Sequence, residues 1–383
     1  MDSAPESEFR ERVRLFLVEH CMRRVESRDT PMLDDRTTAM TFQRRLFDAG
    51  LAGLTVPSEY GGQGLTRRHQ EIFNEEAVDF YLPIGLYTIT IGMCIPVLLE
   101  HGTDEQRRRH IANMLAGHEI WCQMFSEPNA GSDVASLQMR ALRDGDEWII
   151  NGQKVWTSSA HYASYGMCVT RTDVNLPKHK GLTMMIVPMD APGVTVRPLI
   201  QATGDHGFNE VFCDDVRVPL DNVVGEINDG WRVALSMLMN ERVALGASGN
   251  SLVSGRADVL IEAAKALGAT THLVVRQALI DVYIREQVLR FVALRVRAAV
   301  ESGHAPGAEG SIAKLAGSEL VAWLEGDDDA RKAVRTFVHA PSFAIAGGTT
   351  EVQRNIIGER VLGLPKDPEV DRGVPFKDVL VNR

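Results

Sequence analysis

The chain has 383 residues, of which 44% are hydrophobic and 24% are charged. These values are ordinary for a soluble globular protein, so they exclude disordered, collagen-like and coiled-coil chains, and the length predicts two or three domains. Lys and Arg number 41 against 51 Asp and Glu, and the resulting net charge of −10 makes nucleic acid an unexpected partner.

The first residues and the cysteines predict a cytoplasmic protein. The N-terminal sequence MDSAPESEFRER is polar and lacks the apolar core of a signal peptide. No apolar run reaches the ~20 residues that span a bilayer. The five cysteines are scattered without a CxxC pair, and the histidines show no ligand spacing. We therefore expect buried free thiols and no metal site.

Residues 1–118 have the spacing of helices, interrupted by glycine-containing loops. One helix is expected within 101–117. Thr103 can cap its first turn, and Gln106 follows three residues later, so the two side chains can form a capping box. The sequence therefore predicts a helical N-terminal domain.

Residues 119–225 have the pattern of short strands, typical of a small barrel or sandwich. Asp144-Gly145 is a hairpin-turn dipeptide between two of these strands. Helical spacing returns over 226–383. The order α, β, α excludes Rossmann and TIM architectures, in which strands and helices alternate. We predict an α+β chain of three domains: 1–118, 119–225 and 226–383.

The loop FSEPNAGSD, residues 125–133, follows a predicted strand. Its proline and glycine permit tight turns. Such a loop can present backbone N–H groups and the hydroxyls of Ser126 and Ser132 to an anion or to the edge of a heteroaromatic ring. The alternative is a structural turn in which Asp133 caps the next segment.

The segment NGQKVWTSSA, residues 151–160, ends a predicted strand with a tryptophan and three hydroxyl side chains. Trp156 can cover the face of a flat ring while a neighbouring hydroxyl bonds to the edge of that ring. On an unbroken strand, Trp156 and Ser158 share one face and Ser159 points to the other. A core tryptophan with surface hydroxyls is the alternative.

The segment GWRVALSMLMNERVALG, residues 230–246, has a helical apolar stripe that includes Glu241. A carboxylate on an apolar face must be paired, protonated or functional. Desolvation raises the pKa of such a group toward the range of a general base. An ion pair with Arg242 or Arg232 within the helix is the alternative. Arg242 also suits a phosphate or carboxylate ligand.

The segment FAIAGGTTEVQRNIIGERVLGLP, residues 343–365, places two glycines before a predicted helix. Gly347 and Gly348 permit close approach of the backbone to a ligand, and Thr349 and Glu351 follow at the start of the helix. This arrangement is typical of an anion or cofactor site. A plain helix cap is the alternative.

Taken together and in this order, the segments resemble the acyl-CoA dehydrogenase family over nearly the whole chain. SEPNAGSD resembles the T-E-P-x-x-G-S-D loop of the family and INGQKVWTS its flavin-edge strand. GWxxAxxxLxxER resembles its substrate helix, and GGTTEVQRNIIGERVLG its C-terminal flavin-binding turn. No GxGxxG opens a helix after a strand, and the P-loop, HExxH and GxSxG motifs are absent.

The resemblance implies a helical N-terminal domain, a β-barrel-like middle domain and a C-terminal helical bundle. It implies FAD as cofactor and an acyl-CoA thioester as substrate, which is oxidised to a trans-2-enoyl-CoA. It also implies an electron-transferring flavoprotein as electron acceptor. The acyl group is left open among fatty, branched and steroid side-chain groups.

The resemblance also implies roles for single residues. Phe125 and Ser126 correspond to contacts with the pyrimidine edge of the flavin, Trp156 to a ring against the isoalloxazine, and Ser158 to a hydroxyl near flavin N5. Further FAD contacts are implied at Gln123, Gly131, Ser132, Thr349 and Glu351, and substrate contacts at Ser132, Arg242 and Gly347.

The position of the catalytic base varies within the family. Many members carry it immediately before the Gly-Thr of the C-terminal turn, where this chain has Gly347. Others, resembling isovaleryl- and long-chain-specific enzymes, place it on the substrate helix before an arginine, and Glu241-Arg242 matches that arrangement. The resemblance therefore implies that Glu241 removes the α-proton of the substrate.

Two family motifs are weak in this chain. The arginine expected to bind the FAD pyrophosphate aligns with about Ala266, although the pair Arg276-Gln277 is present. The stretch around 318–335 is roughly 10–20 residues short of the usual spacing. We therefore expect an oligomer, either homomeric or with a related subunit. Two alternatives stay open: an FAD-binding partner subunit of a heteromeric enzyme, and a dehydrogenase of an acyl group on a carrier protein.

Overall fold

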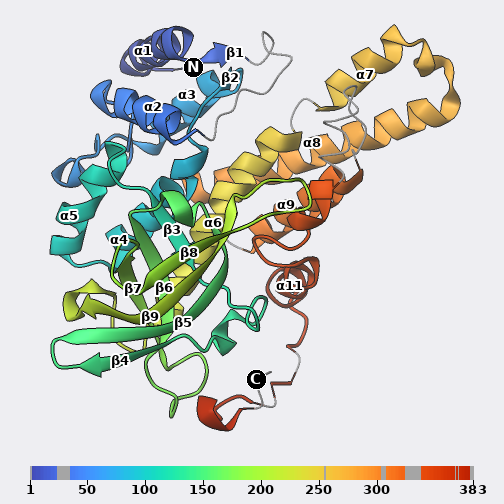
Figure 1. Cartoon of the computed structure of the whole chain (residues 1–383). Coiled ribbons are helices and arrows are strands. Elements are labelled where there is room, and N and C mark those ends of the chain that lie inside the picture. The colour runs from blue at the N-terminus through green and yellow to red at the C-terminus, as the bar shows by residue number, and fades with distance from the viewer. Residues whose placement is uncertain are drawn as a thin grey trace. The chain divides into compact units, whose positions relative to one another are not determined.

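A computed structural model describes residues 2–23, 35–253, 256–302, 308–323, 338–366, 368–369 and 371–379. The chain forms two compact units. The first consists of Met1–Leu199, His206–Met237 and Asp371–Arg383, and the second of Ile200–Asp205 and Leu238–Val370. The elements follow the predicted order of helices, sheet and helices (Figure 1).

The described part of the first unit begins with five α-helices: α1 (Ala4–His20), α2 (Arg36–Asp48), α3 (Arg67–Ala77), α4 (Ile95–His101) and α5 (Asp104–Leu115). The capping box predicted for α5 is confirmed. The Thr103 side chain accepts a hydrogen bond from Gln106 N, and the Gln106 side chain accepts one from Thr103 N. Gln106 Nε2 also donates to the carbonyls of Asp221 and Val223 at 2.7 and 2.8 Å, which fastens α5 to the sheet.

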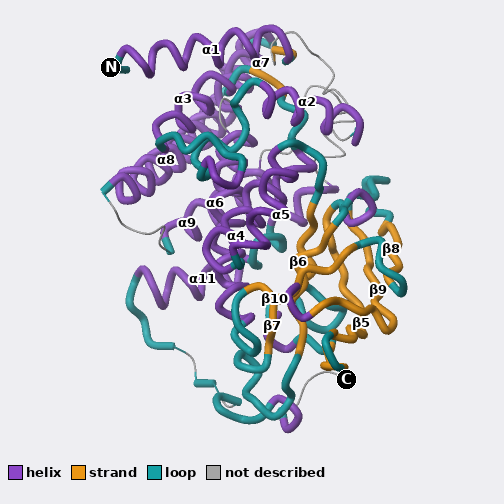
Figure 2. The backbone as a smooth tube through the Cα atoms, turned by 90° about the vertical axis from the view of Figure 1, so that its left-hand side faces the viewer, coloured by secondary structure: helices purple, strands orange, loops and turns teal. Residues whose placement is uncertain are grey.

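Eight strands form the main sheet of the first unit, with the order β10-β7-β6-β4-β5-β9-β8 and with β3 parallel to β6. The sheet occupies the region where the sequence predicts a β-barrel-like domain (Figure 2). Its strands are β3 (Trp121–Met124), β4 (Arg140–Asp144), β5 (Glu147–Ser158), β6 (Tyr165–Arg171), β7 (Leu182–Pro188), β8 (Val194–Leu199), β9 (Phe208–Pro219) and β10 (Val223–Val224). A separate antiparallel pair joins β1 (Met22–Arg23) to β2 (Phe80–Tyr81).

The interior of this sheet is sulfur-rich and apolar. Strands β6 and β7 are buried almost throughout, because both of their faces are covered. The Asp144-Gly145 hairpin is confirmed between β4 and β5, with Gly145 at φ +62°. All five cysteines are free. Four of them are buried as expected, whereas Cys21 is half-buried.

The second unit is helical. Helix α6 (Gly230–Val253) starts in the first unit and continues into the second, where α7 (Arg256–Ala266), α8 (Leu273–Glu301), α9 (Glu309–Trp323) and α11 (Thr350–Ile356) follow. Ala257, Val282, Leu289 and Leu320 form its buried apolar cluster. Within the helical spacing predicted over 226–383, the part at 330–340 lies mostly outside the described residues. No described helix is long and apolar enough to cross a membrane.

Candidate active site

The loop after β3 is held from inside the sheet by a buried lysine. Lys154 on β5 is fully buried, and its Nζ donates 2.9 Å hydrogen bonds to Phe125 O and to Glu127 Oε1. The Glu127 carboxylate also accepts hydrogen bonds from Gln138 N at 2.6 Å and Met139 N at 2.9 Å. The loop is therefore clamped at its first residues and again where it meets the next strand.

The candidate residues of this loop differ in exposure. Phe125 is buried, Ser126 and Gln123 are half-buried, and Gly131 and Ser132 are exposed. Ser126 O accepts a hydrogen bond from Val155 N at 2.9 Å, so the loop also pairs with β5 through its backbone. The small exposed residues at the loop tip leave their backbone accessible to a ligand.

Trp156 has a strained backbone on the exposed side of β5. Its φ is +59°, and the pairing of β5 with β9 shifts register between Lys154 and Thr157, so a β-bulge surrounds it. The side chain is 60% exposed, and its ring meets Phe208 edge-on with centroids 5.9 Å apart. The alternative of a core tryptophan is therefore wrong. A bulky residue in the left-handed region costs about 1–3 kcal/mol, and such strain gathers at functional sites.

The hydroxyl residues after Trp156 are separated by the end of the strand. Thr157 is buried, whereas Ser158 is half-buried, so Trp156 and Ser158 share the accessible side. Strand β5 ends at Ser158. Ser159 adopts φ +56° and its N–H donates to Gly207 O at 2.8 Å. The expected alternation of side chains therefore stops at Ser158 and does not place Ser159.

The second unit contains a glycine turn whose carbonyls are bound by two side chains. Gly347 and Gly348 adopt φ +67° and +92°. Gln353 Nε2 donates to Gly347 O at 2.7 Å, and Lys314 Nζ donates to Gly348 O at 2.6 Å. The φ of Gly348 is one that L side chains rarely adopt, and a Cβ there would also displace Gln353 Nε2, 2.7 Å away, so this position favours glycine. Thr349 then caps α11 by accepting from Val352 N at 3.3 Å.

The ammonium group of Lys314 interacts electrostatically with the carboxylates of two candidate residues, Glu241 and Glu351. Burial lowers the pKa of Lys314 below its usual value of 10.5, while Glu241 and Glu351 each act to raise it. Both carboxylates are therefore close enough to the ammonium to interact with it. Glu241 is half-buried and Glu351 is exposed. Arg242 lies on α6, but its side chain is outside the described part.

The structure thus gathers the candidates within two separate units. The first unit holds the 125–133 loop with Trp156 and Ser158, and the second holds Glu241 with the Gly347-Gly348 turn. The residues of the first unit fit a flavin. Trp156 offers an exposed aromatic face, and Gly131 and Ser132 offer an exposed backbone and a hydroxyl. A flat ring with polar edges needs both kinds of group.

The sequence does not single out three residues that organise these sites. Lys154 and Glu127 are 27 positions apart, and Lys314 lies on α9, so their partners are set by packing. A charged residue at a buried strand position was the available signal for Lys154.

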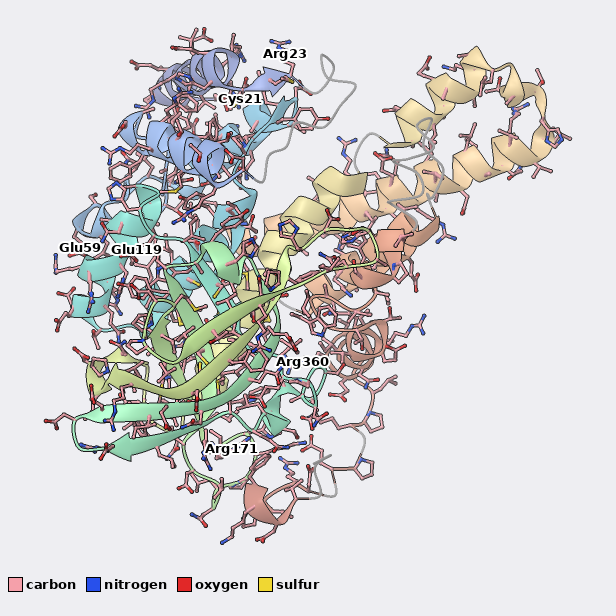
Figure 3. The ribbon with its side chains drawn as sticks, in the orientation of Figure 1. Cys21, Arg23, Glu59, Glu119, Arg171 and Arg360 are labelled. Carbon is pink, nitrogen blue, oxygen red and sulfur yellow. The ribbon has the colours of Figure 1, made fainter. Side chains whose placement is uncertain are left out.

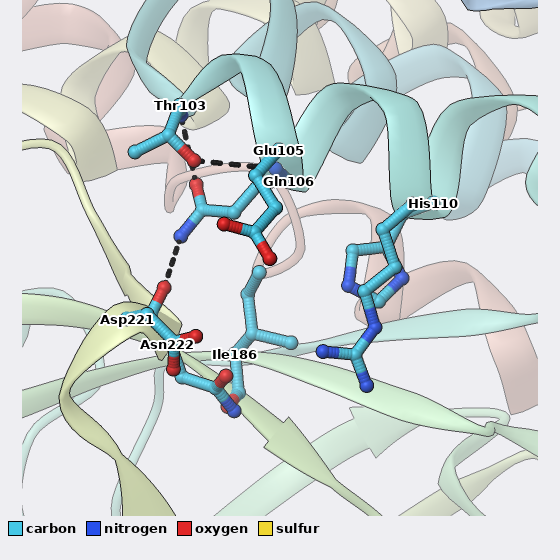
Figure 4. A pocket seen from close by; sticks show the side chains of 8 residues that line it. Thr103, Glu105, Gln106, His110, Ile186, Asp221 and Asn222 are labelled. Atoms are coloured by element: carbon cyan, nitrogen blue, oxygen red, sulfur yellow. Dashed lines mark hydrogen bonds between the residues drawn. The ribbon is translucent and has the colours of Figure 1, made fainter.

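A small hollow elsewhere holds none of the predicted site residues. It contains about 20 Å³ between α5 and the end of β7, and its lining includes Thr103, His110, Ile186 and Asn222 (Figure 4). That space suffices for about one water molecule. Among the described residues, no cluster of His, Cys, Asp and Glu could hold a metal ion.

Three family models match the chain in succession. Residues 3–118 match the N-terminal domain of acyl-CoA dehydrogenases, residues 122–216 the middle domain, and residues 228–362 the C-terminal domain. Together they cover most of the sequence, in the same order as the helices, sheet and helices of the structure.

Individual proteins are also similar. The chain is 39% identical to acyl-CoA dehydrogenase FadE34 of Mycobacterium tuberculosis over an aligned region of 335 residues. This region covers 85% of this chain but only 46% of FadE34. Among solved structures, the ChsE4-ChsE5 complex from Mycobacterium tuberculosis has a TM-score of 0.77 at 31% identity, covering 96% of this chain and 99% of that chain. The Tcur3481-Tcur3483 steroid ACAD, G363A variant, has a TM-score of 0.80 at 28% identity, with 96% and 100% covered.

Proposed function

The chain belongs to the acyl-CoA dehydrogenase family of oxidoreductases, and from this premise we propose that it uses FAD and Glu241 to oxidise an acyl-CoA thioester to the trans-2-enoyl-CoA. The choice of Glu241 as the base depends on one observation, its electrostatic interaction with Lys314. Glu241 lies within electrostatic reach of the ammonium that holds the Gly347-Gly348 turn. Gly347 itself has no side chain to act as a base.

The reaction breaks two C–H bonds and forms one C=C bond. The Glu241 carboxylate takes the α-proton, and the electron pair of that bond becomes the new double bond. FAD, when bound, would supply flavin N5 as the acceptor of the hydride from the β-carbon. Half-burial keeps the Glu241 carboxylate partly shielded from water and leaves it accessible to a ligand, as a positioned general base requires.

The remaining candidate residues would bind the cofactor and the substrate and orient them. Trp156 offers a flat exposed face for the isoalloxazine, and the strain in its backbone supports a role in binding rather than in folding. Ser158 lies on the same accessible side of the sheet. Backbone and hydroxyl groups of Phe125, Ser126, Gly131 and Ser132 would bind the polar edges, and Gln123, Thr349, Glu351 and Gly347 would add contacts. Arg242 would approach the thioester end of the substrate.

A purified chain with added acyl-CoA tests this proposal. The flavin absorption at its visible maximum should bleach under anaerobic conditions when the right acyl-CoA is added. Straight-chain, branched and steroid side-chain acyl-CoAs should be compared, because one solved relative is named as a steroid ACAD. Acyl groups on a carrier protein form a further arm of the panel. A chain that binds FAD but bleaches with none of these thioesters would contradict the proposal.

A partner subunit is the second candidate, because the chain keeps an apolar stripe on α8. Ile280, Ile284, Val288 and Phe291 lie at helical spacing on this helix and are each more than half exposed. A solved relative is a complex of two named chains. The chain also has Ala266 where a family arginine is expected, and a neighbouring subunit could complete the cofactor site.

The mass and the FAD-to-chain ratio of the chain expressed alone separate the two candidates. One tightly held FAD per chain in a homo-oligomer would support the first. A colourless chain that gains FAD only on co-expression with a related subunit would support the second. An electron-transferring flavoprotein stays the proposed electron acceptor, and the cytoplasm the proposed location.

A further inference from the structure

The C-terminal segment Asp371–Val379 returns to the first unit and pairs with the loop after β6. Phe376 N donates to Leu176 O at 2.9 Å, and Lys377 N donates to Val174 O at 3.0 Å. The segment is therefore bound through its backbone, in the manner of a short added strand.

The side chain of Arg171 joins this segment to the loop of residues 126–137. Arg171, labelled in Figure 3, ends β6. It is 2% exposed. Its guanidinium donates to Ala135 O at 2.6 Å, and its Cζ lies 3.6 Å from the centroid of the Phe376 ring. Among the described residues, no carboxylate forms an ion pair with it. Burial lowers the pKa of Arg171 to about 10, so the guanidinium keeps its charge at neutral pH.

A second connection runs through Lys178. Its ammonium forms ion pairs with Asp133 at 3.1 Å and with Asp371 at 3.0 Å. Burial lowers the pKa of Lys178, but its bonds to Asp371 and Asp133 outweigh that effect and raise the pKa overall. Asp133 also accepts a 2.6 Å hydrogen bond from Ser136 Oγ. The lysine therefore ties the C-terminal segment to the residue that directly follows Ser132.

These two connections hold the half of the loop that Lys154 does not hold. The bonds of Lys154 and Glu127 anchor the beginning of the loop and its exit at Gln138 and Met139. Arg171 and Lys178 contact the stretch between these anchors, from Asp133 to Leu137. That stretch follows the exposed tip of Gly131 and Ser132, which has no such anchor of its own among the described residues.

We propose that the C-terminal segment, acting through Arg171 and Lys178 as positioning residues, holds the 126–137 loop in the conformation that binds the cofactor. This inference rests on the proposed function for its ligand, FAD, but not for its effect on the loop. Loss of the Phe376 ring or of the Asp371 charge should loosen the loop, although neither residue need touch the cofactor.

Hydrogen–deuterium exchange of the FAD-free chain tests the effect on the loop. In Phe376→Ala, amides of residues 130–137 should exchange about three- to tenfold faster than in the parent, because one stabilising contact is lost. Phe376→Tyr keeps the ring over Arg171 and should restore slow exchange. The β4–β5 hairpin serves as the internal reference, since its amides pair within the sheet.

The affinity for FAD, measured by quenching of flavin fluorescence, tests the effect on the ligand. Phe376→Ala and Asp371→Asn should each bind FAD about three- to tenfold more weakly. Glu369→Gln is the matched control, since Glu369 pairs with the exposed Lys366 just before this segment. Faster loop exchange with unchanged FAD affinity would overturn the positioning role, as would unchanged exchange. A parent chain that binds no FAD would refute the proposed function, and the exchange data would still decide whether the segment positions the loop.

Discussion

Lys154 and Glu127 form an ion pair of 2.9 Å inside the sheet-bearing unit, where neither side chain is more than 8% exposed. Two buried charges of this kind tolerate each other only as a pair, because either one alone would have to leave water without compensation. The pair is also the anchor of the loop that carries Ser126 and Ser132, so the fold of this loop and its proposed role in binding depend on the same contact.

Glu127→Gln should therefore destabilise the chain strongly. The variant keeps the size of the side chain but leaves the Lys154 ammonium buried without its counter-charge, at a cost of about 3–5 kcal/mol. Chemical denaturation measures this loss. Glu262→Gln breaks an exposed pair with Lys265 and should cost about 1 kcal/mol or less. Equal losses in the two variants would contradict the assignment of the buried pair.

Glu241→Gln should fold and keep the FAD affinity of the parent. It should reduce acyl-CoA-dependent bleaching of the flavin by about 10²- to 10⁴-fold, because it removes a positioned general base. Stopped-flow absorbance measures the rate. Glu319→Gln, which breaks an exposed pair with Arg354, is the control and should leave the rate unchanged. Activity of Glu241→Gln within a few-fold of the parent would end its assignment as the base.

Substitutions at Trp156 should separate stability from binding. Glycine adopts the φ of +59° without strain, so Trp156→Gly should be more stable than Trp156→Ala by about 1 kcal/mol. Both variants should lose FAD affinity, because both lose the exposed ring. A greater stability of Trp156→Ala than of Trp156→Gly would argue against backbone strain at this position.

Ser158→Ala should shift the flavin spectrum, whereas Thr195→Ala, an exposed change on β8, should not.

Lys314→Met should move the pH dependence of bleaching. A carboxylate that loses a nearby positive charge holds its proton more tightly, so less of it is ionised at a given pH. The acid limb of the rate profile should therefore shift to higher pH, and Lys314→Arg should shift it less. Rates between pH 5 and 9 measure this change. An unshifted profile in Lys314→Met would show that the ammonium does not act on the base.

Local features of the fold could be predicted from the sequence, and long-range ones could not. The capping box of Thr103 and Gln106 and the Asp144-Gly145 hairpin depend on residues within a few positions of each other, and both are confirmed. The bulge at Trp156 depends on how β5 pairs with β9, some fifty positions away. The strand pattern alone predicted that the side chains alternate through Ser159, whereas the strand of the structure ends at Ser158.

The same distinction applies to the candidate site. Glu241 and the Gly347-Gly348 turn are separate segments of sequence, and Lys314, which interacts with both, is visible only once α6, α9 and α11 are folded. The contact of Phe376 with Arg171 joins residues about two hundred positions apart. No spacing rule reaches that far, so the C-terminal segment carried no signal of its role.

The path of the chain has a consequence for the C-terminal segment. The stretch from Leu238 to Val370 belongs to the second unit, and the segment that begins at Asp371 belongs to the first. The backbone bonds of Phe376 and Lys377 to Leu176 and Val174 therefore close a loop of about two hundred residues. Closing a loop costs conformational entropy, and this cost grows only slowly with the length of the loop. The contacts of the segment have to offset that cost, so each contact that is removed makes release of the segment easier.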